Sequence, residues 1–458
     1  MEGHDNTIGW TIALALGAGI GSQVLARALR LPSLVLMLAT GVLLGPDGAD
    51  LVRPAELATG LQVFVGVAVA LILFEGGLAL DFDRMRRAER PIRGLLSVGA
   101  ALTAVAAAAL AHYVLGWDPR LAIPFGALVI VTGPTVIGPL LARLRPHRRV
   151  ATVLETEGVL GDALGAIAAA VALEVALSST GEAIALALPA LAGRLVAGAA
   201  LGLVGGALIA LLRRSASSVP ERLSNGLTVG LVVVLFHAAN AALPESGVAA
   251  VVAAGFVVRR VGGRNALILA EFKEQVIPIF IGALFVLLAA DVRLADVWAL
   301  GWPGAIVCAA LALLVRPLAV ALSTYGSDLS VPERATLAAI APRGIVAASV
   351  ASLFAFKFGE HGVEGGNAFR ALVFAVIASS VASAAVLGPM IISLTGIRRR
   401  ESDGWLIHGA TPLSAMVAQV LAQEDQSVVL LDPDPHRVRR MEALGHRCLQ
   451  GDGLEPSA

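Results

Sequence analysis

Four ionisable side chains lie inside long apolar stretches of the sequence, where charged residues are rare. They are Glu157, Asp162, Arg316 and Arg343. An unpaired charge at the centre of a bilayer costs roughly 2.5 kcal/mol or more, so each of these residues is a candidate for ion transport or for a charge pair. Two carboxylates and two guanidinium groups can neutralise one another, or can bind a small cation and a proton in turn.

The spacing of Glu157 and Asp162 predicts different roles for the two carboxylates. Five residues turn about 140° around an α-helix, so the two side chains need not share one proton. The permanently charged Arg316 could neutralise Glu157 as a buried pair. Asp162 would then be the carboxylate that is free to exchange partners, and protons would compete with Na⁺ or K⁺ for it.

Helix-breaking residues interrupt two of the apolar stretches. The interruptions are Thr132-Gly133-Pro134-Thr135 and Ala341-Pro342-Arg343-Gly344. Freed backbone groups are tolerated in a membrane only where they face protein or a polar cavity, and a matched pair of broken helices indicates a transporter binding site. The two interrupted stretches are seven spans apart, and this odd offset predicts repeats of inverted topology.

The composition is that of a polytopic membrane protein. Of 458 residues, 57% are apolar and 15% are charged, and the mean hydropathy is +0.82. Soluble domains carry about 25% charged residues. The formal net charge is zero, which gives no reason to expect a nucleic-acid partner. Stretches long enough to cross a bilayer predict an all-α fold with about thirteen transmembrane helices. The predicted spans are 8–29, 31–46, 57–80, 92–115, 120–142, 151–176, 186–212, 223–240, 245–258, 274–290, 296–322, 334–356 and 370–396.

Positive charge alternates between successive loops of this set of spans. One set of loops carries most of the cationic residues. The intervening loops carry only Arg53, Arg120, Arg293, Lys357 and Arg370. Because cytoplasmic loops are enriched in Lys and Arg, we expect the N-terminus outside and the C-terminus in the cytoplasm. The chain is therefore expected to be a multi-pass protein of the plasma (inner) membrane.

The sequence after residue 400 changes to a soluble α/β pattern, which divides the chain into a transmembrane domain at 1–397 and a cytoplasmic piece at 404–458. The predicted strands are 405–408, 427–431 and 446–449, and the predicted helices are 412–424 and 435–444. Asp432 follows the second strand, 23 residues after Gly409, where dinucleotide-binding folds place a ribose-binding acid. A nucleotide is therefore a candidate ligand of this Rossmann-like piece, although the GxGxxG spacing is absent.

The membrane part, over residues 8–396, resembles the NhaP/NHE branch of the monovalent cation/proton antiporter superfamily. The resemblance is carried, in chain order, by Leu73-Phe74-Glu75-Gly76-Gly77-Leu78 with Asp81, Thr132-Gly133-Pro134, Glu157-Gly158-Val159-Leu160-Gly161-Asp162, Glu245-Ser246-Gly247-Val248-Ala249, Leu314-Val315-Arg316-Pro317-Leu318 and Arg343-Gly344. It implies inverted repeats with two crossed broken helices, a mobile core, and a scaffold that forms a homodimer.

The same resemblance assigns roles to single residues. Asp162 would bind the cation or the proton, and Arg316 would pair with a structural Glu157. Thr132 would lie at the unwound crossing, and Arg343 would lie beside the second break.

Two glycines depart from the pattern of the family. Many relatives have Asp where this chain has Gly133, and Asn where it has Gly161, so two side-chain ligands are missing. The hydroxyls of Thr132 and Thr135, backbone carbonyls of the unwound segment around Gly133, or water could replace them. A single free carboxylate, Asp162, predicts electroneutral exchange of one cation for one proton.

The residues after 404 resemble the start of a TrkA-N or RCK regulatory domain, which implies control by a nucleotide or another ligand. The leading hypothesis is a secondary antiporter that works by alternating access, with no enzymatic activity and no required cofactor. One alternative is a gated potassium efflux channel, although a TVGYG-type filter is absent. The other is a non-transporting sensor, suggested by Gly133 and Gly161 and opposed by the retention of Glu157, Asp162 and Arg316.

Overall fold

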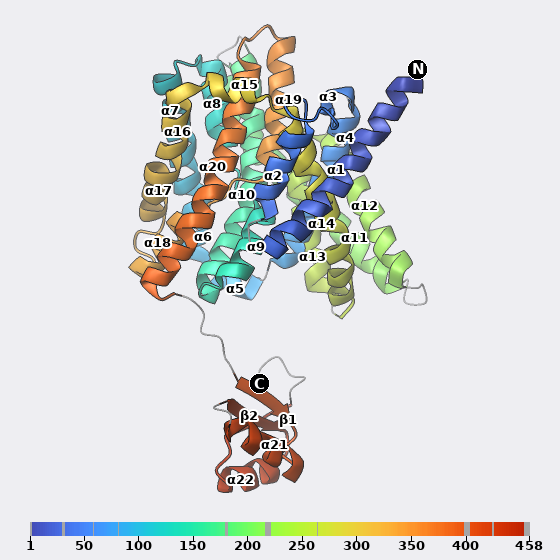
Figure 1. Cartoon of the computed structure of the whole chain (residues 1–458), viewed down its shortest axis with the longest axis vertical. Coiled ribbons are helices and arrows are strands. Elements are labelled where there is room, and N and C mark those ends of the chain that lie inside the picture. The colour runs from blue at the N-terminus through green and yellow to red at the C-terminus, as the bar shows by residue number, and fades with distance from the viewer. Residues whose placement is uncertain are drawn as a thin grey trace. The chain divides into compact units, whose positions relative to one another are not determined.

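The structure is a computed structural model, and it describes residues 2–29, 33–57, 59–80, 82–178, 182–215, 221–262, 264–397, 404–423 and 426–452. The chain forms two compact units, Met1–Arg398 and Arg399–Ala458. The first unit is a bundle of helices and the second is a small α/β unit (Figure 1).

The first half of the membrane unit consists of helices that follow the predicted spans closely. They are α1 (Glu2–Leu29), α2 (Ser33–Leu44), α3 (Pro54–Leu57), α4 (Thr59–Ala79), α5 (Phe82–Arg87), α6 (Glu89–Gly94), η1 (Leu95–Gly99), α7 (Ala100–Leu115), α8 (Pro119–Leu128), α9 (Pro134–Leu144) and α10 (Arg148–Leu177).

The second half begins with α11, the seventh span, and continues with the counterparts of the helices above. They are α11 (Glu182–Ser215), α12 (Glu221–Ala242), α13 (Ser246–Gly262), α14 (Arg264–Asp291), α15 (Leu294–Ala299), α16 (Gly301–Ala310), η2 (Leu311–Val315), α17 (Arg316–Ser323), α18 (Val331–Ala339), α19 (Ile345–Glu360) and α20 (Gly366–Thr395).

Among the described residues, eight helical segments are long and apolar enough to cross a membrane unaided. The other predicted spans correspond to α2, α13 and α14 and to the two interrupted pairs, α8 with α9 and α18 with α19. Each of the thirteen predicted spans therefore has a helical counterpart. Hydropathy alone misses the interrupted pairs because each half is too short to cross the bilayer by itself.

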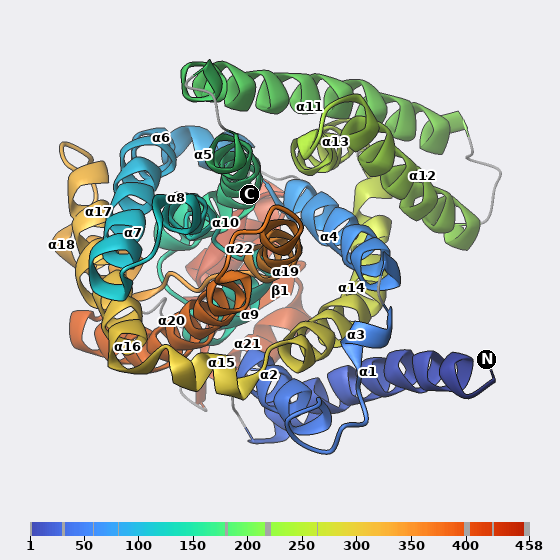
Figure 2. The same cartoon turned by 90° about the horizontal axis from the view of Figure 1, so that it is seen from above.

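The membrane helices pack as two groups, which Figure 2 shows from above. We call α1, α2, α4 and α11 to α14 the scaffold group, because they pack mainly against one another. The core group consists of α7 to α10 and α16 to α20 with η1 and η2. Helix α10 lies at the boundary, where it also contacts α11 and α13.

Two π-helical turns occupy equivalent places in the repeats. Turn η1 lies inside the fourth span and η2 inside the eleventh, so they show the same offset of seven spans as the two interruptions. Gly94, just before η1, packs its Cα directly against the backbone of Ser323 at the end of α17. The matched interruptions and matched π turns agree with the inverted repeat that was predicted.

The second unit has the predicted βαβαβ order. Its elements are β1 (Gly404–His408), α21 (Pro412–Gln423), β2 (Ser427–Asp432), α22 (Pro435–Ala443) and β3 (Cys448–Gln450). The three strands are parallel in the order β1-β2-β3, with Leu406 opposite Val429 and Leu431 opposite Leu449. A small core that includes Leu430 and Met441 holds the helices on the sheet.

Candidate ion-binding site

The two interrupted spans cross at two glycines. A Cβ atom on Gly133 would lie 2.3 Å from the Cα of Gly344, and a Cβ atom on Gly344 would lie 2.4 Å from the Cα of Gly133. The N–H of Gly133 donates to the carbonyl of Pro342 (3.2 Å), which joins the two unwound segments. Pro134 begins α9, where the missing N–H of proline costs nothing. The close approach of the two chains therefore requires glycine on both sides.

Asp162 lies on α10 beside this crossing. Its side chain is buried, with a residue exposure of 1%, and Oδ1 has no hydrogen-bond partner among the described residues. The same oxygen lies 3.6 Å from the Cβ position of Gly344, the N-cap of α19. A helix N-terminus carries partial positive charge, which favours a carboxylate there. The unpartnered oxygen is an acceptor that a proton or a small cation could satisfy.

Glu157 is fully engaged, one and a half turns earlier on α10. Arg316 Nη1 and Nη2 donate to Glu157 Oε1 and Oε2 at 2.5 and 2.9 Å, and both side chains are more than 90% buried. Arg316 also donates through Nε and Nη2 to the carbonyl of Leu337 in the last turn of α18. This bidentate geometry is the strongest form of a carboxylate–guanidinium pair. The structure thus places Glu157 and Arg316 together and leaves Asp162 apart from them.

Arg343 connects the two interruptions. Its backbone N–H donates to Ser380 Oγ on α20 (3.0 Å), and its Nη1 donates to the carbonyl of Ile130 (3.2 Å), just after the end of α8. Carbonyl groups at a helix C-terminus carry partial negative charge and are satisfied by cations. The buried guanidinium therefore stabilises the C-terminal end of the half-helix α8.

Thr132 and Gly161 are in direct contact. Thr132 Oγ1 donates to the carbonyl of Glu157 (3.2 Å), and a Cβ atom on Gly161 would lie 2.8 Å from that hydroxyl oxygen. A side chain at position 161 would therefore displace Thr132. Glycine is therefore required at position 161 because a larger residue would not fit beside Thr132. Glycine is required at position 133 because the backbone of Gly344 lies too close. The side chain of Thr135 lies outside the described residues.

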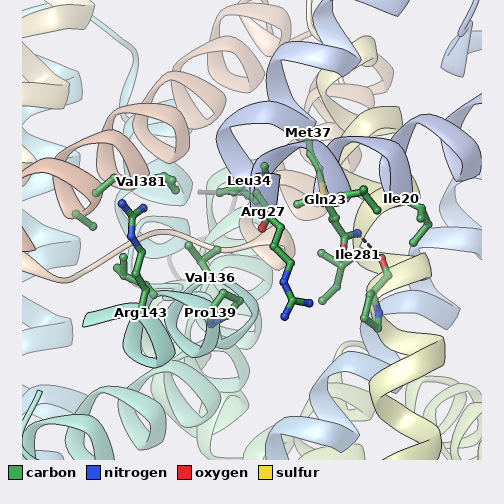
Figure 3. A pocket seen from close by; sticks show the side chains of 17 residues that line it. Ile20, Gln23, Arg27, Leu34, Met37, Val136, Pro139, Arg143, Ile281 and Val381 are labelled. Carbon is green, nitrogen blue, oxygen red and sulfur yellow. Dashed lines mark hydrogen bonds between the residues drawn. The ribbon is translucent and has the colours of Figure 1, made fainter. Parts of the chain in front are cut away.

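Two cavities lie between the scaffold and core groups. The larger, about 480 Å³, is lined by α1, α2 and α14 on one side and by α9 and α20 on the other (Figure 3). The smaller, about 320 Å³, is lined by scaffold helices such as α4, α12 and α14 and by α10, α19 and α20. The larger cavity reaches Val136 near the start of α9. The smaller one reaches Ala166, about one turn from Asp162, and Val346 near the start of α19.

Several contacts at the site could not be recognised in the sequence. Ser380 is a serine in a long apolar helix, and its role depends on its meeting the backbone of Arg343. The carbonyls of Ile130 and Leu337 carry no sequence signal at all. The residue pattern at Ala341-Pro342-Arg343-Gly344 indicated the break but not the contact of Gly344 with Gly133.

Asp432 is buried at the end of β2 in the second unit. Its Oδ2 accepts from the N–H of Ala410 (2.7 Å) and its Oδ1 from the N–H of Asp434 (2.8 Å). These backbone donors, Ala410 first, hold the pKa of Asp432 below its ordinary value. Oδ2 thus braces the turn after β1, and Oδ1 braces the turn between β2 and α22. A nucleotide-binding role for Asp432 stays a prediction.

Replacing Asp432 by asparagine should loosen the second unit. The lost charge-assisted bonds correspond to about 1–3 kcal/mol, so amides of β1 and β2 should exchange hydrogen about tenfold faster or more. Hydrogen exchange of the full-length protein measures this, with Glu442→Gln as the control. Because the pKa is lower in the folded state, the stabilisation is present above about pH 4 and is lost as the pH falls through the folded-state value. Unchanged protection in Asp432→Asn would contradict the bracing role.

A crossing of two broken helices is a feature that many secondary-transporter folds share. The profile of the family described as "Sodium/hydrogen exchanger, transmembrane" matches residues 12–393. The chain belongs to this family.

Similar proteins are known from several organisms. The chain is 25% identical over 165 residues to Na(+)/H(+) antiporter 1 of Methanocaldococcus jannaschii, an alignment that covers 35% of this chain and 38% of that protein. It is 25% identical over 161 residues to the Na(+)/H(+) antiporter NhaH of Halobacillus dabanensis, covering 34% and 40%. The matches thus span about two fifths of the length of these relatives. The solved structure of the sodium proton antiporter MjNhaP1 from Methanocaldococcus jannaschii at pH 8 superposes with a TM-score of 0.73 at 21% identity, over 85% of this chain and 99% of that one.

Proposed function

We propose that the protein is a secondary antiporter that exchanges Na⁺ or K⁺ for protons, with Asp162 binding the cation and the proton in turn. The observation that carries the proposal is the unpartnered Asp162 Oδ1 at the glycine crossing. Ligands that could complete a cation shell are the backbone carbonyls freed by the interruption near Gly133 and the hydroxyl of Thr132. Relatives named as Na(+)/H(+) and K(+)/H(+) antiporters support either ion.

The charges around the site favour electroneutral exchange. Glu157 and Arg316 cancel each other, and an ionised Asp162 would balance Arg343. A proton or a monovalent cation on Asp162 adds the same single charge. The two loaded forms therefore carry equal net charge, and a membrane potential favours neither of them.

Movement of the core group against the scaffold group would expose Asp162 to each side in turn. The two cavities support this, because one follows α9 and the other α19 away from the crossing. Two ion pairs bind the groups together, Arg370 with Asp291 (2.8 Å) and Arg194 with Glu174 (2.7 Å). We further propose the orientation given by the loop charges, with the cavity beside α9 facing the cytoplasm, in the plasma (inner) membrane. A homodimer formed through the scaffold group follows from the family resemblance.

Proton flux in proteoliposomes, started by Na⁺ or K⁺, tests the proposal. Wild-type protein should move protons at a rate that is unchanged by an imposed membrane potential. Asp162→Asn should reduce the flux to the level of empty liposomes, because an amide can neither release a proton nor bind a cation by charge. Glu155→Gln, a change of the same kind on the same helix at an exposed position, should keep the flux.

The other outcomes separate the alternatives. Cation flux without proton movement would indicate a channel instead. No flux with either ion, from protein with a normal melting curve, would indicate a sensor.

A further inference from the structure

The larger cavity has an apolar wall and a basic rim. Most of its wall is hydrophobic side chains, including Ile20, Met37, Val136, Leu140 and Ile281. Figure 3 shows Ile20, Met37, Val136 and Ile281 around the space between α1, α2, α9 and α14. Gln23 is the main polar group of the wall, and it is already engaged, since its amide donates to the carbonyl of Pro278 (2.7 Å). The wall therefore offers apolar contacts to an acyl chain.

The charged members of the lining are two arginines from opposite groups of helices. Arg27 lies in the last turn of α1 and Arg143 in the last turn of α9. Both are exposed, and neither forms an ion pair with any carboxylate in the described part of the chain. In Figure 3 the Arg27 side chain reaches between Pro139 of α9 and Ile281 of α14. The rim therefore carries two positive charges that no carboxylate within the described ranges neutralises.

We propose that this cavity binds an anionic phospholipid, whose phosphate is attracted by the positive charges of Arg27 and Arg143 at the rim and whose acyl chain lies on the apolar wall. Basic pockets between transmembrane helices are known to bind anionic headgroups. A soluble phosphate would satisfy the arginines but would leave the apolar wall unfilled. A zwitterionic lipid would fill the wall but would bring no net charge to the rim.

The cavity lies between the scaffold group and the core group, which are proposed to move against each other. Its wall combines α1, α2 and α14 of the scaffold group with α9 and α20 of the core group. A bound lipid would therefore contact both groups at once. In the orientation proposed above, this lipid would lie in the cytoplasmic leaflet. The binding itself does not depend on that orientation.

Native mass spectrometry of the purified full-length protein, titrated with phosphatidylglycerol or with phosphatidylcholine of the same acyl chains, tests the proposal. The wild type should bind phosphatidylglycerol more tightly than phosphatidylcholine. Each basic residue near an anionic surface contributes about fivefold, so Arg27→Gln with Arg143→Gln should weaken phosphatidylglycerol binding about 25-fold and leave phosphatidylcholine binding unchanged.

Two further variants make the result specific. Arg86→Gln with Arg90→Gln removes two exposed arginines that do not line the cavity, and it should leave binding unchanged. Val24→Trp fills the cavity from an exposed position on α1 and should weaken both lipids.

Three outcomes would overturn the proposal. They are equal binding of the two lipids to the wild type, an equal loss in the Arg86 and Arg90 control, and binding of glycerol phosphate as tight as that of phosphatidylglycerol. Binding is measured without transport, so a failure here is distinguishable from a failure of the antiport proposal.

Discussion

Replacing Arg316 by alanine should destabilise the protein by about 3–5 kcal/mol, because the change leaves the Glu157 carboxylate buried and uncompensated. Both side chains of the pair are more than 90% buried, and Arg316 supplies both donors to the carboxylate. The same change also removes two donors from the carbonyl of Leu337. A lower melting temperature in detergent and a smaller amount of folded protein in the membrane would report the loss.

A second substitution separates the charge from the packing. Arg316→Ala combined with Glu157→Gln leaves the same space at position 316 but removes the stranded carboxylate charge, so it should be more stable than Arg316→Ala alone. If the double variant melted no higher than the single one, the charge pair would not be what stabilises α10 against α17. Neither variant alters Asp162, so any transport that remains in the double variant can be assigned to the free carboxylate.

Alanine at Gly133 or at Gly344 should have the second large effect. The added Cβ atom would lie 2.3 or 2.4 Å from a backbone Cα, and no rotamer change can move a backbone atom away. Inserting a methyl group into a well-packed interior costs about 1–3 kcal/mol where side chains can shift, so the cost here should reach or exceed the upper end of that range. Melting temperature and proton flux should both fall.

Gly138→Ala is the matched control for Gly133→Ala, because Gly138 lies on α9, the helix that follows Gly133. A Cβ atom at Gly138 would meet nothing within 4 Å. Gly138→Ala should therefore be neutral, or should stabilise the helix by up to about 1 kcal/mol. Equal behaviour of Gly133→Ala and Gly138→Ala would show that the crossing is looser than the structure indicates.

The membrane spans could be predicted because hydropathy and loop charge report on the same property, the crossing of a bilayer. The interruptions could be predicted because proline and glycine act locally. The need for glycine at position 133 could not be predicted, because it depends on contact with Gly344, more than two hundred residues away in the sequence. The sequence suggested that position 133 lacks an ion ligand, whereas the structure shows that it has no room for one.

The charge pair was a feasible prediction because few ionisable groups lie in the membrane. With four candidates, the spacing of Glu157 and Asp162 left only a small number of pairings. The structure agrees on the pairing of Glu157 with Arg316 but adds the partners of Arg343, which are a carbonyl and a serine hydroxyl. Such partners are common throughout any chain, and only the tertiary fold selects among them.

The π turns η1 and η2 allow the fourth and eleventh spans to change length by one residue. A π turn closes its hydrogen bonds from residue i to i+5, so it holds one residue more than an α turn. Deleting a residue within Leu95–Gly99 or Leu311–Val315 would convert the turn to α geometry. The helix on either side would keep its face toward its neighbours. Each of these spans therefore contains one residue more than a continuous α-helix needs, and the eleventh span could lose that residue without rotating Arg316 away from Glu157.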